Sequence, residues 1–237
     1  MNIIITGAGG GLGEATVLAL ARMGKHRIVG VGRSKKHLDA VQRKRDQEHT
    51  ASEFIPIVFD LTSDESDFSK KLRPQIEGVC DSIDCLINNA GRFETITFVQ
   101  STQKDWQAMI DVNLLGPMKL IRSLFSLMTR APCAHIVNIG SMAGFQGSQK
   151  FAGLSAYSSS KASLACMTEC LAQELPTNIR VNCLCFGSIA TKMFRRAFPT
   201  DTAAISADEA GSFVANFALS GWKMFHGKII PVTVKTP

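Results

Sequence analysis

Residues 6–13 read TGAGGGLG and stand between a short apolar run and a stretch with apolar residues at helical spacing. Glycines let the backbone turn sharply and let a phosphate approach without a Cβ in the way. A helix starting behind them would add free N–H groups and the positive end of its dipole. The spacing is not G-x-G-x-x-G but T-G-x-x-x-G-x-G, at Thr6, Gly7, Gly11 and Gly13. The stretch predicts a phosphate-binding turn between a strand and a helix, with a merely flexible turn as the alternative.

Strand-like and helix-like segments alternate along the rest of the chain. Short apolar runs bounded by turn residues predict strands at 2–6, 27–32, 54–60, 83–91, 134–141, 179–187 and 227–232. Apolar residues at helical spacing predict helices at 12–24, 36–49, 64–76, 103–129, 154–175 and 206–219. Pro74 should end or kink the third helix, and Ser206 and Glu209 have the spacing of a capping box. Residues 188–205 are expected to be irregular.

This alternation decides the fold class. Strands joined through helices imply right-handed crossovers and a parallel sheet that is covered on both faces. The sequence therefore predicts an α/β fold: a single-domain, Rossmann-type, doubly wound parallel sheet of about seven strands, flanked by helices on both faces. Because no repeat, low-complexity tract or linker interrupts the pattern, one domain is expected over residues 1–237.

Composition argues against several classes of protein. The hydrophobic share of 45% and charged share of 19% are ordinary for a soluble globular domain. No apolar run reaches the roughly 20 residues of a membrane span, and no basic region precedes the first one. We therefore expect a cytoplasmic protein with no signal peptide and no membrane partner. The net charge is +6, but the most basic stretch has no aromatic residues for base stacking, so no nucleic-acid partner is expected. The seven cysteines form no C-x-x-C pair, and no metal site is expected.

A basic group follows the second predicted strand. Sites that select NAD place a carboxylate near this point to bind the ribose 2′-hydroxyl. Here the chain has Arg33 and Ser34, followed by two lysines. A guanidinium group suits a phosphate, so the sequence favours NADP(H) over NAD(H). The alternative is a solvent-exposed basic start of a helix.

Polar residues also follow the third, fourth and fifth predicted strands, where ligands bind in sheets of this kind. Asp60 suits either an adenine amino group or the cap of a turn. Residues 88–91, NNAG, suit either a plain turn or side-chain amides that brace the strand ends. Ser141 suits either a turn or a hydrogen bond to a substrate carbonyl. With no histidine nearby, a Ser-His-Asp triad is not expected.

Tyr157 is the only tyrosine in the chain, and Lys161 follows it four residues later on a predicted helix. Residues at this spacing share a helix face, with Cβ atoms about 6 Å apart. A cation roughly 5 Å from the phenol is worth about 3 kcal/mol, which would lower the phenol pKa by about two units. The pair therefore predicts a general acid or base, and a chance pairing with a half-buried tyrosine is the alternative.

Together these motifs resemble the classical branch of the short-chain dehydrogenase/reductase family over nearly the whole chain. The pattern at residues 6–13 is similar to the family's cofactor signature, and NNAG at 88–91 to its second motif. The resemblance implies that Asn113, Ser141, Tyr157 and Lys161 are the catalytic residues. It implies cofactor binding by Thr6, Gly7, Gly11, Leu12, Gly13, Arg33, Ser34, Asp60, Leu61, Asn89, Ala90, Gly91, Tyr157, Lys161, Gly187, Ile189 and Thr191.

The family resemblance also implies a mechanism. Hydride passes between C4 of the nicotinamide and a carbonyl carbon, and Tyr157 gives or takes the proton at the oxygen. Ser141 holds that oxygen, Lys161 binds the nicotinamide ribose and lowers the phenol pKa, and Asn113 anchors a water. The expected activity is that of an NADP(H)-dependent carbonyl reductase or alcohol dehydrogenase on a small-molecule substrate. A homodimer or homotetramer is expected through the helices near 103–129 and 154–174.

The sequence departs from the family pattern after the sixth strand. Phe186-Gly187 replaces the usual Pro-Gly, and the substrate lid after Thr191 is short. These changes leave open a second function, a catalytically silent NADP(H)-binding sensor or regulator. Against it, such a sensor would not need the complete set of predicted catalytic residues.

Overall fold

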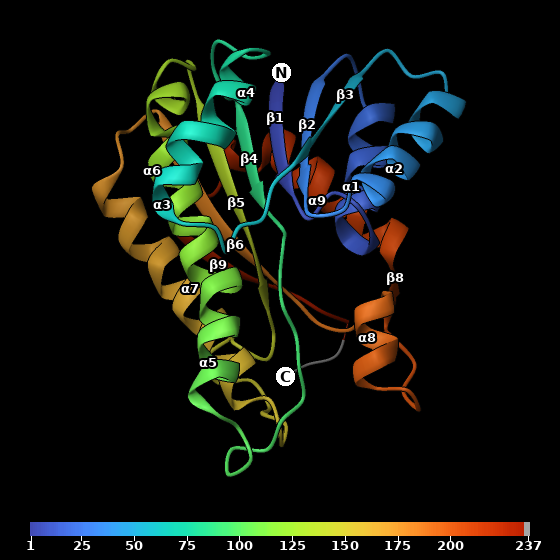
Figure 1. Cartoon of the computed structure of the whole chain (residues 1–237), viewed down its shortest axis with the longest axis vertical. Coiled ribbons are helices and arrows are strands. Elements are labelled where there is room, and N and C mark those ends of the chain that lie inside the picture. The colour runs from blue at the N-terminus through green and yellow to red at the C-terminus, as the bar shows by residue number, and fades with distance from the viewer. Residues whose placement is uncertain (235–237) are drawn as a thin grey trace.

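The centre of the molecule is one sheet of seven parallel strands in the order β3-β2-β1-β4-β5-β6-β9 (Figure 1). The structure is a computed structural model that describes residues 1–234. The strands are β1 (Asn2–Thr6), β2 (Arg27–Gly32), β3 (Glu53–Val58), β4 (Cys85–Asn88), β5 (Ala134–Ser141), β6 (Ile179–Phe186) and β9 (Lys228–Val232). The doubly wound parallel sheet predicted from the sequence is thereby confirmed.

Burial and proline positions explain which strands lie at the centre. β4 is buried at every residue and β5 at all but its last, as expected for strands with helices on both faces. Proline cannot donate a ladder hydrogen bond, and sheets tolerate it mainly in edge strands. Pro56 and Pro231 lie in β3 and β9, which are the two edges of the sheet.

Helices cover both faces of the sheet (Figure 1). On one face, Ile3 and Ile5 of β1 belong to a buried cluster with residues of α1 (Gly11–Arg22), α2 (Lys35–Gln47) and α9 (Ala207–Ser220). On the other, Ile4 packs with residues of α6 (Gly116–Thr129), and residues of α7 (Ser155–Glu174) pack against the same cluster. Successive residues of β1 thus point to opposite layers.

Two predicted helices are not continuous α-helices. The segment at 64–76 divides into α3 (Glu65–Asp67), a π-turn η1 (Phe68–Leu72) and α4 (Arg73–Glu77), with Pro74 in the first turn of α4. The segment at 103–129 divides into α5 (Gln103–Ile110), a π-helical turn η2 (Asp111–Leu115) and α6. Pro117 has no N–H for the carbonyl of Asn113 four residues earlier, which explains the irregular turn before it.

The prediction of an irregular segment at 188–205 was wrong. It contains β7 (Ile189–Ala190) and α8 (Lys192–Ala197), and β7 pairs with β8 (Ile205–Ser206) in a second, two-stranded sheet. The Thr191 hydroxyl caps α8 by accepting a hydrogen bond from the Phe194 amide at 3.2 Å. The predicted capping box at Ser206 and Glu209 is present at the start of α9, and the 3₁₀ turn η3 (Gly221–Lys223) follows that helix. Among residues 1–234, no helix is long and apolar enough to cross a membrane.

Candidate active site

The glycine-rich turn lies between β1 and α1, as its sequence predicted. Gly7 and Gly11 adopt φ of 68° and 56°, a region that favours glycine. A Cβ on Gly13 would lie 2.2 Å from the Gly7 carbonyl oxygen, so only glycine allows this close packing. Gly10, the N-cap of α1, supplies no side-chain cap, and a Cβ added to it would meet nothing within 4 Å. Uncapped helix amides facing open space fit the diphosphate of a dinucleotide.

The NNAG motif braces this turn. The Thr6 hydroxyl accepts hydrogen bonds from the backbone amides of Asn89 at 3.1 Å and Ala90 at 3.0 Å. The Asn89 side-chain amide donates to the Thr6 carbonyl at 2.9 Å, and that of Asn88 donates to Asn138 at 2.8 Å. Of the two interpretations of NNAG, the structure supports side-chain amides that tie neighbouring strand ends together.

The basic residues after β2 stand beside the glycine-rich turn. A Cβ on Gly9 would lie 3.0 Å from the His37 side chain, so the start of α2 reaches this turn. The Ser34 hydroxyl caps α2 by accepting from the His37 amide at 3.3 Å. Arg33 is exposed and forms no ion pair within residues 1–234. Its guanidinium group is therefore available to an anionic ligand at this end of the sheet.

Asp60 caps a turn. Its Oδ1 accepts hydrogen bonds from the amide and the hydroxyl of Thr62, both at 2.9 Å. One of the two roles considered for Asp60 is thus confirmed, and the adenine contact stays a prediction. The neighbouring Leu61 is buried and lies close to Gly116, at the first residue of α6.

Asn113 lies in the π-helical turn η2 and connects several backbone segments. Its Oδ1 accepts from the Arg92 amide at 2.8 Å, and its Nδ2 donates to the Arg92 carbonyl at 2.9 Å. Nδ2 also donates to the Ser160 hydroxyl at 2.9 Å, and that hydroxyl donates to the Tyr157 carbonyl at 2.7 Å. Ser160 was not predicted, because a serine within a serine-rich helix gives no sequence signal.

Lys161 is buried, with 4% of its surface exposed, and its Nζ donates to the Ile139 carbonyl at 2.7 Å. Burial lowers the pKa of this lysine to about 8, against the opposing effect of Cys183 and Cys185. A Cβ on Gly91 would lie 3.6 Å from Nζ and 3.4 Å from Asn113 Oδ1. The NNAG turn therefore lies against two of the predicted catalytic residues, Lys161 and Asn113.

Tyr157 differs from its prediction in one respect. Burial raises the pKa of its phenol, while a hydrogen bond with Ser141 lowers it by a smaller amount. The net direction is opposite to the lowering predicted from Lys161, because the phenol is desolvated and the ammonium group is directed at Ile139. Ser141 also accepts from the Ala143 amide at 3.2 Å, so its turn role is confirmed together with its proximity to the phenol.

Two phenylalanines beside the phenol were missed by the sequence analysis. The ring of Phe93 packs edge-on against Tyr157, with centroids 4.7 Å apart. The ring of Phe198, which follows α8, lies 6.0 Å from Phe93. Neither position carries a sequence motif. The pair could not be predicted, because only the tertiary fold brings the end of α8 to the residues after NNAG.

The remaining predicted cofactor residues lie on the segment after β6. A Cβ on Gly11 would lie 3.4 Å from the Thr191 methyl group, so the start of α8 covers the glycine-rich turn. The Gly187 amide donates to the Val232 carbonyl at 3.0 Å, and Ile189 packs against the core of the α1 face. The predicted residues thus follow the carboxyl ends of β1 to β6, except for Asn113 on η2 and Tyr157 and Lys161 on α7.

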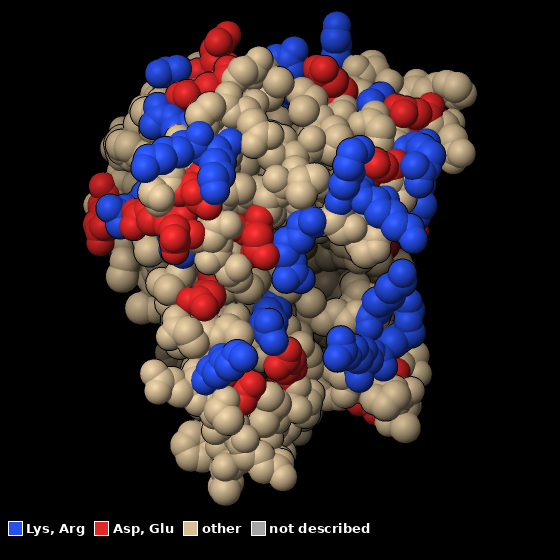
Figure 2. Space-filling view, in the orientation of Figure 1, with Lys and Arg blue, Asp and Glu red and all other residues tan. Residues whose placement is uncertain are grey.

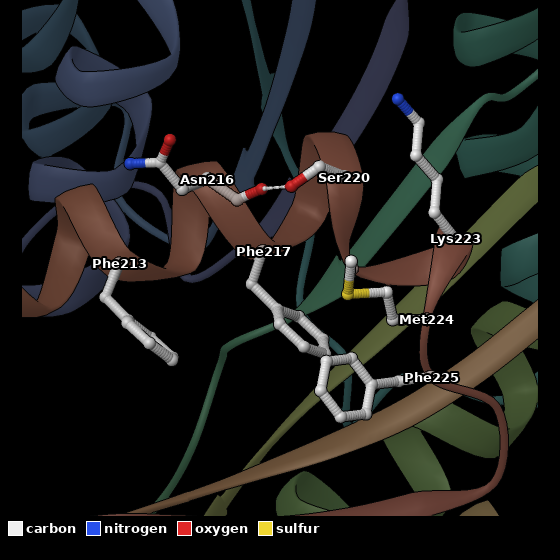
Figure 3. Close-up of a pocket in the computed structure, with 8 residues that line it drawn as sticks. Phe213, Asn216, Phe217, Ser220, Lys223, Met224 and Phe225 are labelled. Carbon is white, nitrogen blue, oxygen red and sulfur yellow. Dashed lines mark hydrogen bonds between the residues drawn. The ribbon is translucent and has the colours of Figure 1, made fainter.

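The surface above these strand ends is hollowed and positively charged. In Figure 2, Lys and Arg side chains gather around a hollow below β1 and β2 and beside α8. A different hollow, of about 290 Å³, lies along the second half of α9 and η3 and is lined mainly by Phe213, Phe217, Met224 and Phe225 (Figure 3). It is apolar and stands beyond the amino end of β9, so it does not belong to the candidate site.

Comparisons with known proteins agree with this geometry. The chain is 34% identical over 191 residues to a 3-oxoacyl-[acyl-carrier-protein] reductase of Thermotoga maritima, covering 80% of this chain and 74% of that protein. A 3-oxoacyl-[acyl-carrier-protein] reductase of Synechocystis is 33% identical over the same shares. The NADPH complex of a short-chain dehydrogenase from Escherichia coli superposes with a TM-score of 0.88 at 25% identity, covering 97% of this chain and 95% of that one.

A second solved structure and a family model complete the comparisons. An NADP complex of a short-chain dehydrogenase from Shigella flexneri has the same fold, with a TM-score of 0.88 over 97% of this chain and 95% of that one, at 23% identity. The model described as short chain dehydrogenase matches residues 1–202, which include every predicted catalytic and cofactor residue. The chain therefore belongs to the short-chain dehydrogenase/reductase family of oxidoreductases.

Proposed function

We propose that this protein is an NADP(H)-dependent carbonyl reductase or alcohol dehydrogenase that acts on a small molecule. The observation that carries the proposal is the meeting of Tyr157, Ser141 and Lys161 with Asn113 next to an uncapped glycine-rich turn. These residues come from β5, α7 and η2, and the NNAG turn that follows β4 lies against both Lys161 and Asn113.

The proposed chemistry needs a proton at the oxygen of the substrate. When bound, NADP(H) supplies the hydride that is exchanged with the carbonyl carbon. The Ser141 hydroxyl would hold the carbonyl oxygen, and the Tyr157 phenol would donate its proton to it. Because burial raises the pKa of Tyr157, the phenol carries its proton at neutral pH, which suits an acid in the direction of reduction.

Lys161 and Asn113 would support that transfer. Lys161 lies close to the NNAG turn, and its ammonium group would hold the hydroxyls of the nicotinamide ribose. With a pKa of about 8, it can also release and regain a proton near neutral pH. Asn113 fixes the backbone of Arg92 and the Ser160 hydroxyl, which in turn holds the Tyr157 carbonyl. It would act by positioning the helix that carries the phenol.

NADP(H) is favoured over NAD(H) by Arg33. Its guanidinium group forms no ion pair within residues 1–234 and would meet the ribose of the adenosine there, and the segment 32–36 offers no carboxylate for a 2′-hydroxyl. The relatives complexed with NADP and NADPH point the same way. We further propose that residues 1–237 form one cytoplasmic domain that assembles as a homodimer or homotetramer.

A turnover screen tests the proposal. Purified protein with NADPH is offered ketones, quinones and 3-oxoacyl thioesters, and loss of nicotinamide absorbance is followed. The thioesters are included because two relatives are named as 3-oxoacyl reductases. Turnover with at least one class is expected. Tight NADPH binding without turnover across the whole panel would favour the alternative, a silent NADP(H)-binding sensor or regulator.

A further inference from the structure

The helix α8 presents two different faces. Phe194 and Phe198, four residues apart, lie on one side, with ring centroids 5.3 Å from one another. By helical spacing Lys192 and Arg196 fall on the opposite side, and both are exposed, as is Arg195. A segment of six residues thus carries three cations on the surface beside the cleft.

Contacts at both ends of α8 fix its position at the cleft. Thr191, its N-cap, stands against Gly11 of the glycine-rich turn. Phe198, just after its last residue, contacts Phe93, which packs on Tyr157. α8 therefore lies beside the hollow around which Lys and Arg side chains gather in Figure 2, with its last turn next to the Phe93 and Tyr157 pair.

The positive charge of α8 is not neutralised by the protein. Within residues 1–234, none of its three cations forms an ion pair. Two of the carboxylates that follow α8 in the chain have partners of their own: Asp201 accepts from Thr200, and Glu209 closes the capping box with Ser206. Unpaired like charges on neighbouring residues repel each other, and an anionic ligand would relieve that repulsion.

We propose that α8 binds a phosphate or carboxylate group of the substrate, so that the protein prefers carbonyl compounds with an anionic tail. Phe93 and Phe198 would contact the apolar part next to the carbonyl, and the tail would extend over α8. The inference rests on the proposed function, which identifies the cleft as the site of carbonyl reduction. It assigns the two basic clusters separate tasks: Arg33 for the cofactor and α8 for the substrate.

Two thioesters with the same reacting group test the proposal. Acetoacetyl-CoA carries phosphates, and the acetoacetyl thioester of N-acetylcysteamine is neutral. Their binding to the protein in complex with NADP⁺, which cannot reduce a ketone, is measured by calorimetry. The double variant Arg195→Gln/Arg196→Gln should weaken binding of acetoacetyl-CoA by about fivefold to tenfold, as expected for two exposed charge contacts, and leave the neutral thioester unchanged. Increasing salt should weaken only the CoA thioester.

A matched control removes equal charge elsewhere. Lys25 precedes β2 and Lys223 precedes β9, so both lie towards the amino ends of the strands, away from the carboxyl ends that carry the candidate site. Lys25→Gln/Lys223→Gln should therefore bind acetoacetyl-CoA like the unmodified protein. An equal loss in both double variants would mean that only net charge matters, and would overturn the proposal.

The other outcomes are equally distinct. If the α8 variant loses affinity for NADPH and NADH alike, its cations serve the cofactor diphosphate and the proposal fails. If neither thioester binds while neutral ketones are reduced, the proposal fails and the proposed function stands. If acetoacetyl-CoA binds with the expected preference but no carbonyl compound is turned over, α8 is an anion site and the proposed function fails.

Discussion

At the scale of single residues, the proposed reaction depends on the phenol of Tyr157. Tyr157→Phe keeps the ring that packs on Phe93 and removes only the hydroxyl. Turnover should fall by about 10²- to 10⁴-fold, the usual size of a general-acid contribution, with NADPH binding nearly intact. Absorbance at saturating NADPH gives the rate, and a fluorescence titration gives the affinity. Because the chain has no other tyrosine, undiminished activity would contradict the mechanism.

The choice of cofactor depends on Arg33. Removing the guanidinium group by Arg33→Ala should raise the KM for NADPH and leave that for NADH nearly unchanged. The loss of one charge-assisted contact with a phosphate predicts a change of about tenfold or more in the ratio of the two efficiencies. Lys44→Ala, also on the surface of this region but paired with Glu14, is the control and should not change the ratio. An unchanged ratio in Arg33→Ala would remove Arg33 from the cofactor site.

At the scale of elements, a buried histidine joins three of them. His135 of β5 contacts the Ala218 carbonyl of α9 through Nδ1 and the Asn182 amide of β6 through Nε2, both at 3.1 Å. These partners require a proton on Nδ1 and a lone pair on Nε2, which is the neutral ring. Burial lowers the pKa of His135 to about 4.

This shift makes stability depend on pH. Between the unfolded pKa of about 6.5 and the folded pKa of about 4, the unfolded chain binds the extra proton. The contribution of His135 to the free energy of unfolding should therefore be fully present above pH 6.5. It should decrease by up to about 3 kcal/mol as the pH falls towards 4. Urea unfolding at several pH values measures it. In His135→Gln the slope in this window should become clearly smaller, with a remainder from His26, whose pKa burial also lowers; an unchanged slope would assign the acid sensitivity to other groups.

Elements with a local signal were predicted well. Short apolar runs predicted every strand of the main sheet, and Ser206 with Glu209 predicted the start of α9. The π-turn at Asn113 was missed because helical periodicity continues through it, although Pro117 indicates a break in the hydrogen bonds of the helix. α8 was missed because its six residues are too few for a periodic pattern, and its position depends on the distant contact of Phe198 with Phe93.

The candidate site shows the same division. The residue types at the strand ends could be recognised from the sequence because parallel strands bring their carboxyl ends together. The protonation behaviour of Tyr157 could not, since it depends on desolvation that only packing produces. Lys161 four residues along the helix suggested a lower phenol pKa, but burial outweighs any such effect and the ammonium group is directed at Ile139.

At the scale of the whole molecule, two of the surfaces with exposed apolar side chains lie on helices that could meet a second subunit. Phe125 of α6 is 37% exposed, and the neighbouring α7 exposes Cys166 and Cys170. Around the hollow of Figure 3, Met224 is 86% exposed and Phe213 and Phe225 are partly exposed. Apolar patches of this kind are often contact surfaces between subunits. The two surfaces stand on opposite sides of the sheet, so they would form separate contacts in an assembly.

The proposed contact through α6 and α7 can be tested by substitution. Light scattering of the unmodified protein should give two or four times the chain mass of 25.7 kDa. Phe125→Asp/Cys166→Asp places charges in that contact, where they would be buried without partners, and should halve the mass of the assembly or give monomers. Met224→Asp changes the other surface and should leave at least a dimer. A monomeric unmodified protein, or an assembly that survives Phe125→Asp/Cys166→Asp but not Met224→Asp, would exclude α6 and α7 as the main interface.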